Sequence, residues 1–421
     1  MKNNDFIKFI CNQIVPLEIK FQENSFVISN EHFEYLEEKF DYKSEFSEDD
    51  IEYLKSISIL IKNKQSIDED FFLNKPLFKY WYLFTHEKYF KENIILDKHQ
   101  RISVDNLKNE FLEILKIPIA DVISSKLATK FKCKIISEKR IFLTCDFDII
   151  NIWDIWNYKN FIKEFIKSII KLNFKLSKNL MLSFFLSRYF LKFNGYLNNS
   201  MFLKEKLLGE YRVQNIGFFI SQPKNSIYDG VIKYDENTFN RFLSQTLEEY
   251  ELEIGLHTNY DSSNTDSEVD IKSQIKECDN LFNVVPNKNR HHYLKFIFPS
   301  YLKKFENNIE FDFSLYFPEL TIFRAGTCSE FKVWNFEMNK PFYTKIIPTT
   351  LMDGTFTDYL NVDKKKSLEL AIEKLDLAMR YSNTIVLLWH NRSMYKYSNI
   401  NNNFHPELYK GILKFIKTHN I

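Results

Sequence analysis

The chain has 421 residues, a formal net charge of +1, 44% apolar residues and 27% charged residues. This length allows two domains, or one large barrel with an appendage. The charge balance offers no basic excess for a nucleic acid, so we expect no nucleic-acid partner. No run of about 18 apolar residues occurs, so we also expect no membrane span.

The five cysteines and the first residues bear on the cellular compartment. The cysteines are odd in number and lack a C-x-x-C spacing, which favours neither a zinc ribbon nor a disulfide framework. The N-terminal stretch carries charges within its apolar part and has no small-residue cleavage site, so it is a poor signal peptide. We therefore expect a cytoplasmic protein in a reducing compartment.

Residues 1–137 mix short strand-like and helical pieces and predict an accessory α/β domain. Two isolated histidines, His86 and His99, are more typical of surface or core positions than of ligands. A charged break at 137–140 marks the expected boundary, and residues 138–421 form the second predicted domain.

The second domain opens with the stretch I-F-L-T-C-D-F-D-I-I at 141–150, which predicts a buried strand. Asp146 and Asp148 lie two residues apart, so a strand directs both side chains into one space. Two carboxylates in one space repel each other unless a cation or a proton lies between them. The alternative is a turn at the end of the strand, with both acids facing water.

Strand and helix patterns then alternate to the end of the chain. A long insert at about 151–211 carries apolar residues at helical spacing and predicts two packed helices. After it we expect strands at 215–221, 252–256 and 384–389, helices at 239–247, 301–305 and 368–378, and an extended piece at 321–323. Such alternation predicts a parallel sheet, open or closed into a barrel, whose reactive residues collect at the carboxyl ends of the strands.

The residues at these strand ends could bind a divalent cation. One aspartate and two neutral imidazoles can hold Zn²⁺ or a similar ion and leave positions open for water and substrate. The candidates are Asp146 or Asp148 for the acid, His257 for one imidazole, His292 or His291 for the other, and Asp261 as a rival oxygen ligand.

The other polar residues at strand ends then have chemical roles. The carboxylate that does not bind metal can take a proton from water, Arg324 can hold that carboxylate or a developing oxyanion, and His390 can protonate a leaving nitrogen. Without a metal, His390 could be a core histidine and Arg324 could pair with Glu330. Asp353, in M-D-G-T, is typical of a plain turn, with the lining of a pocket as the alternative.

Six ordered motifs now resemble a known family. They are T-C-D-F-D at 144–148, E-I-G-L-H-T-N-Y at 253–260, R-H-H-Y-L at 290–294, F-R-A-G-T at 323–327, M-D-G-T at 352–355 and L-W-H-N at 388–391. They are similar to motifs of polysaccharide deacetylase-like proteins in the chitooligosaccharide deacetylase (carbohydrate esterase 4) superfamily, in a divergent bacterial branch with an extra N-terminal domain. The resemblance covers residues 138–421, including the helical insert. It implies a distorted (β/α) barrel of the polysaccharide deacetylase type and metal-dependent removal of an acetyl group from a sugar.

The resemblance also implies roles for single residues. Asp146 matches the catalytic base, Asp148 the metal-binding acid, His257 the first histidine of the metal pair, Arg324 the arginine that orients the base, and His390 the general acid.

The chain departs from the family pattern at two points. Phe147 separates the two acids that are usually adjacent, and Asp261 stands where the second histidine is usual. We favour His292 as the replacement ligand because an Arg-x-His-Tyr-Leu run is itself typical of this branch, with Asp261 and His291 left open.

We therefore expect a metal-dependent carbohydrate deacetylase, with Zn²⁺ as the leading metal. Its expected substrate is an acetylated sugar or sugar precursor for surface polysaccharide synthesis. The alternative is an inactive barrel that lost the metal and serves as a carbohydrate-binding or interaction protein.

Overall fold

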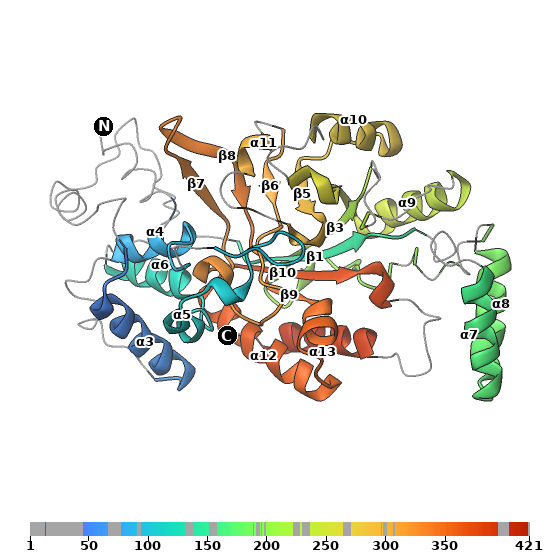
Figure 1. Ribbon diagram of the computed structural model, residues 1–421, viewed down its shortest axis with the longest axis horizontal. Helices are drawn as coiled ribbons and strands as arrows, with labels where there is room; N and C mark the ends of the chain where they lie inside the picture. The colour runs from blue at the N-terminus through green and yellow to red at the C-terminus, as the bar shows by residue number, and fades with distance from the viewer. Residues whose placement is uncertain are drawn as a thin grey trace.

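The structure is a computed structural model. It describes residues 13, 45–65, 77–90, 94–130, 138–150, 158–187, 189–190, 194, 196–197, 199–221, 228–229, 236–263, 271–295, 297, 301–305, 308–394 and 404–419. Within these residues the chain is a mixed α/β protein built on one curled sheet with helices packed outside it (Figure 1).

The sheet runs in the order β7-β8-β6-β5-β4-β3-β1-β10-β9, with β2 paired to β3 beside this path. The pairs β7–β8 and β2–β3 are antiparallel, and all the other pairs are parallel. The strands are β1 (Arg140–Phe147), β2 (Leu207–Leu208), β3 (Tyr211–Phe219), β4 (Glu253–Thr258), β5 (Lys288–His291), β6 (Phe311–Asp312), β7 (Phe331–Asn335), β8 (Lys340–Ile346), β9 (Leu351–Met352) and β10 (Thr384–His390). This curled sheet is compatible with the predicted distorted barrel.

Strand β1 lies inside the sheet, between β3 and β10. Seven of its eight residues are buried, which agrees with its continuous apolar sequence, because a parallel strand is covered on both faces. The predicted strands at 141–150, 215–221, 252–256 and 384–389 are confirmed as β1, β3, β4 and β10. Their parallel pairing gathers their carboxyl ends at one edge of the sheet.

The predicted helices at 239–247, 301–305 and 368–378 are confirmed as α9 (Glu236–Tyr250), α11 (Leu302–Phe305) and α12 (Lys364–Tyr381). Asp363 caps α12 by accepting a hydrogen bond from the Lys366 amide, which satisfies a free N–H of the first turn. Helices α10 (Ile271–Phe282) and α13 (Phe404–Thr418) complete the outer layer. The extended piece expected at 321–323 is instead a bend, and the short helix Arg324–Gly326 follows it.

The regular secondary structure of the N-terminal segment, where the structure describes it, is helical apart from two isolated β-bridges, and turns and loops join the helices. Its helices are α3 (Glu48–Lys62), α4 (Leu77–Thr85), α5 (Asn109–Ile114) and α6 (Ile119–Lys130). They share one hydrophobic core with the sheet, in which Leu54, Phe84 and Ile114 join Leu143 and Leu375. The described part of the predicted accessory domain therefore shares its core with the curled sheet. The boundary expected at 137 falls within 131–137, outside the described residues.

The long insert after β1 contains two helices, as predicted: α7 (Tyr158–Ile170) and α8 (Phe174–Leu186). The two helices lie side by side (Figure 1). They pack around a separate small apolar cluster that includes Phe161 and Leu180. The described helices include none that is both long and apolar enough to cross a membrane.

Candidate metal centre and active site

Parallel pairing brings distant parts of the sequence to one edge of the sheet. Asp146 on β1 lies opposite His390 on β10, and His257 on β4 lies opposite Arg290 on β5. Asp148 follows the end of β1. The predicted convergence of residues at strand ends is therefore present in the structure.

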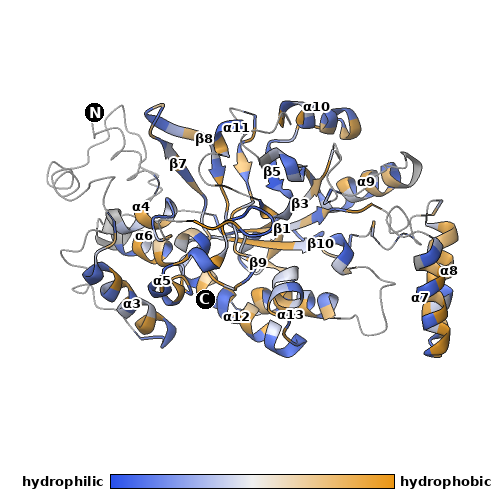
Figure 2. Cartoon of the chain, in the orientation of Figure 1, coloured by the Kyte–Doolittle hydropathy of each residue, from blue (hydrophilic) through white to orange (hydrophobic). Residues whose placement is uncertain are grey.

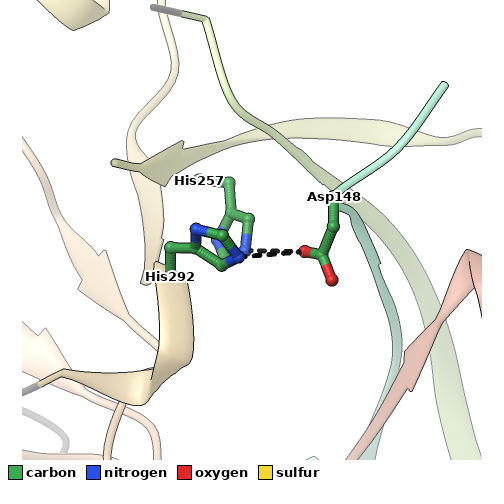
Figure 3. A group of neighbouring side chains, drawn as sticks. All are labelled: Asp148, His257 and His292. Atoms are coloured by element: carbon green, nitrogen blue, oxygen red, sulfur yellow. Dashed lines mark ion pairs between the residues drawn. The ribbon is translucent and has the colours of Figure 1, made fainter. Parts of the chain in front are cut away.

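Three side chains form a possible metal site, shown in Figure 3: Asp148, His257 and His292. Their ligating atoms all lie within 4.8 Å of one another. The Oδ1 atom of Asp148 is 3.3 Å from Nε2 of His257 and 3.7 Å from Nε2 of His292. Asp148 Oδ1 and His257 Nε2 are buried and have no hydrogen-bond partner among the described residues. One carboxylate oxygen and two imidazole nitrogens aimed at one point suit Zn²⁺ or a similar cation.

Both imidazoles are oriented by a partner at their other nitrogen. Nδ1 of His257 lies 2.7 Å from the carbonyl oxygen of Arg290, and Nδ1 of His292 lies 2.6 Å from Oδ1 of Asp229. If each Nδ1–H donates to its oxygen, the lone pair of each Nε2 is free to face Asp148. The buried Asp229 also accepts hydrogen bonds from the Tyr260 amide, which holds its carboxylate in place.

The two other proposed ligands do not join this group. Nδ1 of His291 lies 2.8 Å from the carbonyl oxygen of His292, and its ring packs edge-on against Tyr301 at a centroid distance of 5.2 Å. Asp261 lies in the short helix Tyr260–Ser263, and its carboxylate is not among the converging atoms. Of the candidates for the third ligand, the structure thus places His292 in the group.

The electrostatics of the site favour bound positive charge. Burial raises the pKa of Asp148, but His390, His257 and His292 together outweigh burial and hold this pKa well below its usual value. Burial lowers the pKa of His257, but Asp146 and then Asp148 outweigh it, so the pKa is raised. Because the carboxylates stabilise positive charge on the imidazoles, they would also stabilise a cation at the same point.

Asp146 is held by Arg290. The buried guanidinium donates to Oδ1 of Asp146 at 2.8 Å and to the Thr144 hydroxyl at 2.7 Å. It also donates to the Phe313 carbonyl at 3.3 Å and lies 4.5 Å from the centre of the Phe218 ring. With so many contacts the guanidinium is fixed, and it fixes the carboxylate of Asp146 in turn.

Arg324 does not occupy the position expected for it. Its guanidinium forms an ion pair with Glu87 of the N-terminal segment, with contacts of 2.5 Å and 3.1 Å, and donates to the carbonyl of Tyr316. The alternative partner, Glu330, instead pairs with Arg140 and Lys345. The arginine that contacts Asp146 is therefore Arg290 and not Arg324, as the sequence had predicted. The cause is the bend at 321–323, because Arg324 does not end a strand of the sheet.

His390 is oriented by Asp353. Its Nδ1 lies 2.7 Å from Oδ1 of Asp353, and its amide donates to Oδ2 at 2.9 Å. Its Nε2 lies 3.9 Å from Oδ2 of Asp148. Burial lowers the pKa of His390, but Asp353 and then Asp148 outweigh burial and raise this pKa to about 9. The sequence favours Asp353 as a plain turn residue, but in the structure its carboxylate orients His390.

The group of polar residues at this edge of the sheet lines a cavity of about 440 Å³. Its lining includes Asp146, Asp148, His292 and His390 from the sheet edge, Arg392 and Tyr359 from the C-terminal part, and Lys98, His99 and Arg101 from the N-terminal segment. No pattern in residues 1–137 predicts that the N-terminal segment reaches the site. Only its tertiary packing reveals the contribution.

An aromatic group forms one side of the cavity. His99 lies 4.5 Å from the ring of Tyr293, and Tyr228 lies 5.4 Å from it, between ring centroids. Tyr293 and Leu294 both have a positive φ, which is uncommon for residues with a side chain. Arg101 donates to the carbonyl of Tyr293 at 3.0 Å and so supports this left-handed segment directly after His292. Such backbone conformations are concentrated at functional sites.

Comparisons with known proteins add little to this geometry. No family model matches the chain, and no curated protein matches it. Among solved structures, it is similar to the "crystal structure of putative polysaccharide deacetylase from Mycobacterium smegmatis", with 10% sequence identity and a TM-score of 0.36. The similarity covers 67% of this chain and 86% of that chain. A similarity of this size carries no argument about function.

Proposed function

We propose that this protein is a metal-dependent hydrolase that removes an acetyl group from an acetylated sugar, with a barrel of the polysaccharide deacetylase type. The observation that carries the proposal is the convergence of Asp148, His257 and His292 beside a carboxylate, Asp146, and an imidazole, His390. A divalent ion, with Zn²⁺ as the leading choice, would supply Lewis acidity, which polarises an acyl oxygen and makes water a better nucleophile.

The chain's own residues perform the proton transfers. The carboxylate of Asp146, held in place by Arg290, accepts a proton from the attacking water. The water oxygen adds to the acyl carbon, and the bond from that carbon to the sugar nitrogen or oxygen breaks. Nε2 of His390, supported through Nδ1 by Asp353, gives a proton to the leaving atom. The products are acetate and the deacetylated sugar.

The cavity is consistent with a carbohydrate substrate. The rings of His99, Tyr228 and Tyr293 offer apolar faces beside polar groups, a combination that suits the alternating polar and apolar surface of a sugar ring. Three described cysteines are free and buried, in line with the proposed cytoplasmic setting and a precursor of surface polysaccharide as substrate.

Metal analysis and acetate release test this proposal. Purified protein should contain about one divalent ion per chain, and it should release acetate from at least one member of a panel of N- and O-acetylated sugars and sugar nucleotides. His257→Ala should lose the metal. Asp146→Asn should keep the metal and lose turnover by about 10²–10⁴-fold, because a general base contributes about that much. Protein without metal and without activity after addition of Zn²⁺, Co²⁺, Ni²⁺ or Mn²⁺ would instead support the inactive carbohydrate-binding alternative.

A further inference from the structure

The helical hairpin α7–α8, taken with the short segment after it as residues 158–187 and 189–190, carries a surface that the proposed reaction does not use. It follows β1 in the chain and stands at the edge of the molecule (Figure 1). The two helices bury one face of each against the other, where Phe161 and Phe184 stack at a centroid distance of 4.2 Å. In the described part of the hairpin, the other faces of both helices carry exposed side chains.

These open faces are rich in large apolar side chains. Among the described residues, ten of the twenty exposed large hydrophobic side chains fall within this hairpin. Three of the most exposed lie around its turn: Ile170 at 74%, Leu172 at 73% and Phe174 at 67%. Figure 2 shows hydrophobic colour along both helices, alternating with hydrophilic positions. Apolar side chains so concentrated and so exposed mark an interaction surface.

The same hairpin concentrates positive charge. Lys159, Lys163, Lys167 and Lys171 recur every fourth residue, which places them in a stripe along α7 and into the turn. Lys175 and Lys178 continue the basic surface on α8, and Glu164 is the one acidic residue of 158–187. The whole chain has a net charge of only +1, so this excess is local.

We propose that the hairpin α7–α8 docks the protein onto an anionic lipid surface. Exposed Ile, Leu and Phe side chains at a helix turn can enter the boundary between headgroups and acyl chains, while lysines extend toward the negative headgroups. A second copy of the chain is a poorer occupant, because two lysine-bearing faces would repel each other. The proposal does not depend on the chemistry of the metal centre.

Vesicle co-sedimentation of the full chain tests the docking. The probes are vesicles of phosphatidylcholine alone and of phosphatidylcholine mixed with phosphatidylglycerol. We expect binding to the mixed vesicles, little binding to the neutral ones, and weaker binding when salt rises from about 0.1 M to about 1 M, because the Debye length falls from about 10 Å to about 3 Å.

Two variants separate the contributions of charge and apolar surface. Lys163→Gln combined with Lys171→Gln and Lys175→Gln should lower the partition coefficient by about 100-fold, since each lysine near an anionic surface contributes about 1 kcal/mol. Ile170→Ser combined with Leu172→Ser and Phe174→Ser should lower binding to the mixed vesicles by at least about 10-fold, by removing apolar groups. All six side chains are exposed, so the fold should persist, and circular dichroism checks this.

Matched controls make the same changes elsewhere on the surface. Lys276→Gln with Lys365→Gln and Lys414→Gln alters exposed lysines on α10, α12 and α13, and Val285→Ser with Met338→Ser alters exposed apolar residues. These variants should bind like the wild type. Absent or charge-independent vesicle binding, or equal losses in control and hairpin variants, would overturn the proposal. Concentration-dependent dimers abolished by the hairpin variants, without vesicle binding, would assign the surface to a second copy.

Discussion

Two buried arginines, Arg290 and Arg324, show how one residue type serves two regions of the same molecule. Each binds one buried carboxylate and a backbone carbonyl, and each lies over an aromatic ring. Arg290 holds Asp146, at the edge of the cavity. Arg324 binds Glu87 of the N-terminal segment and the carbonyl of Tyr316, and so connects that segment to the rest of the fold. Burial and pairing are alike in the two, so only the place of the partner carboxylate distinguishes a site residue from a structural one.

Replacement of Arg290 should have the larger effect. Arg290→Met leaves Asp146 buried without its cation, which should lower the free energy of unfolding by about 3–5 kcal/mol. The folded fraction should also lose about 10²-fold in kcat, because the carboxylate is no longer held in position. Urea unfolding and acetate release, measured on the same sample, check both effects.

Arg290→Lys separates position from mere charge. A lysine restores a positive charge but not the planar set of donors that reaches Asp146, Thr144 and the Phe313 carbonyl together. Stability should recover more than kcat, because a lysine supplies the charge but does not hold the Asp146 carboxylate in the same position. Full recovery of kcat would assign Arg290 a structural role alone.

Arg324→Met should affect stability alone. It leaves Glu87 buried without its cation, so we again expect a loss of about 3–5 kcal/mol in the free energy of unfolding. The kcat of the folded fraction should stay within about twofold of wild type, since Arg324 contacts neither Asp146 nor the proposed ligands. The double variant Arg324→Met with Glu87→Met should recover much of the lost stability. A large fall in kcat would contradict the division between the two arginines.

The contrast also explains which parts of the site the sequence could reveal. Three site residues lie within or at the ends of strands with apolar runs: Asp146, His257 and His390. The apolar runs predicted these strands, and the expected parallel pairing predicted that the three side chains would lie close together. Arg290 lies in β5, whose four residues, K-N-R-H, are all polar and carry no strand signal. Arg290 does belong to the R-H-H-Y-L motif, but that motif predicted a role for its histidines only.

Other site residues depend on tertiary contacts. Asp229 lies far from any recognisable motif and acquires its role by facing His292. His99 and Arg101 belong to a segment whose own sequence suggests no site, yet packing against Tyr293 brings them to the cavity. A residue whose role is to position another side chain cannot be predicted from the local sequence pattern, because its partner lies far away in the sequence.

Two histidines offer a smaller, pH-dependent version of the same comparison. His390, at the site, has its pKa raised to about 9, whereas burial chiefly lowers the pKa of His86, in the N-terminal segment, to about 3. A raised pKa contributes stability that is present below the ordinary value of about 6.5 and lost as the pH rises through about 9. A lowered pKa contributes stability that is present above about 6.5 and lost as the pH falls toward about 3.

Urea unfolding of the metal-free protein across this pH range checks both signs. His390→Gln should flatten the alkaline side of the curve of unfolding free energy against pH. His86→Gln should flatten the acid side and leave the alkaline side unchanged. Because the carboxylates of Asp353 and Asp148 raise the pKa of His390, Asp353→Asn should also reduce the alkaline slope. An alkaline slope that persists in His390→Gln would mean that another group is responsible for it, and that the imidazole is not held protonated by its two acidic neighbours.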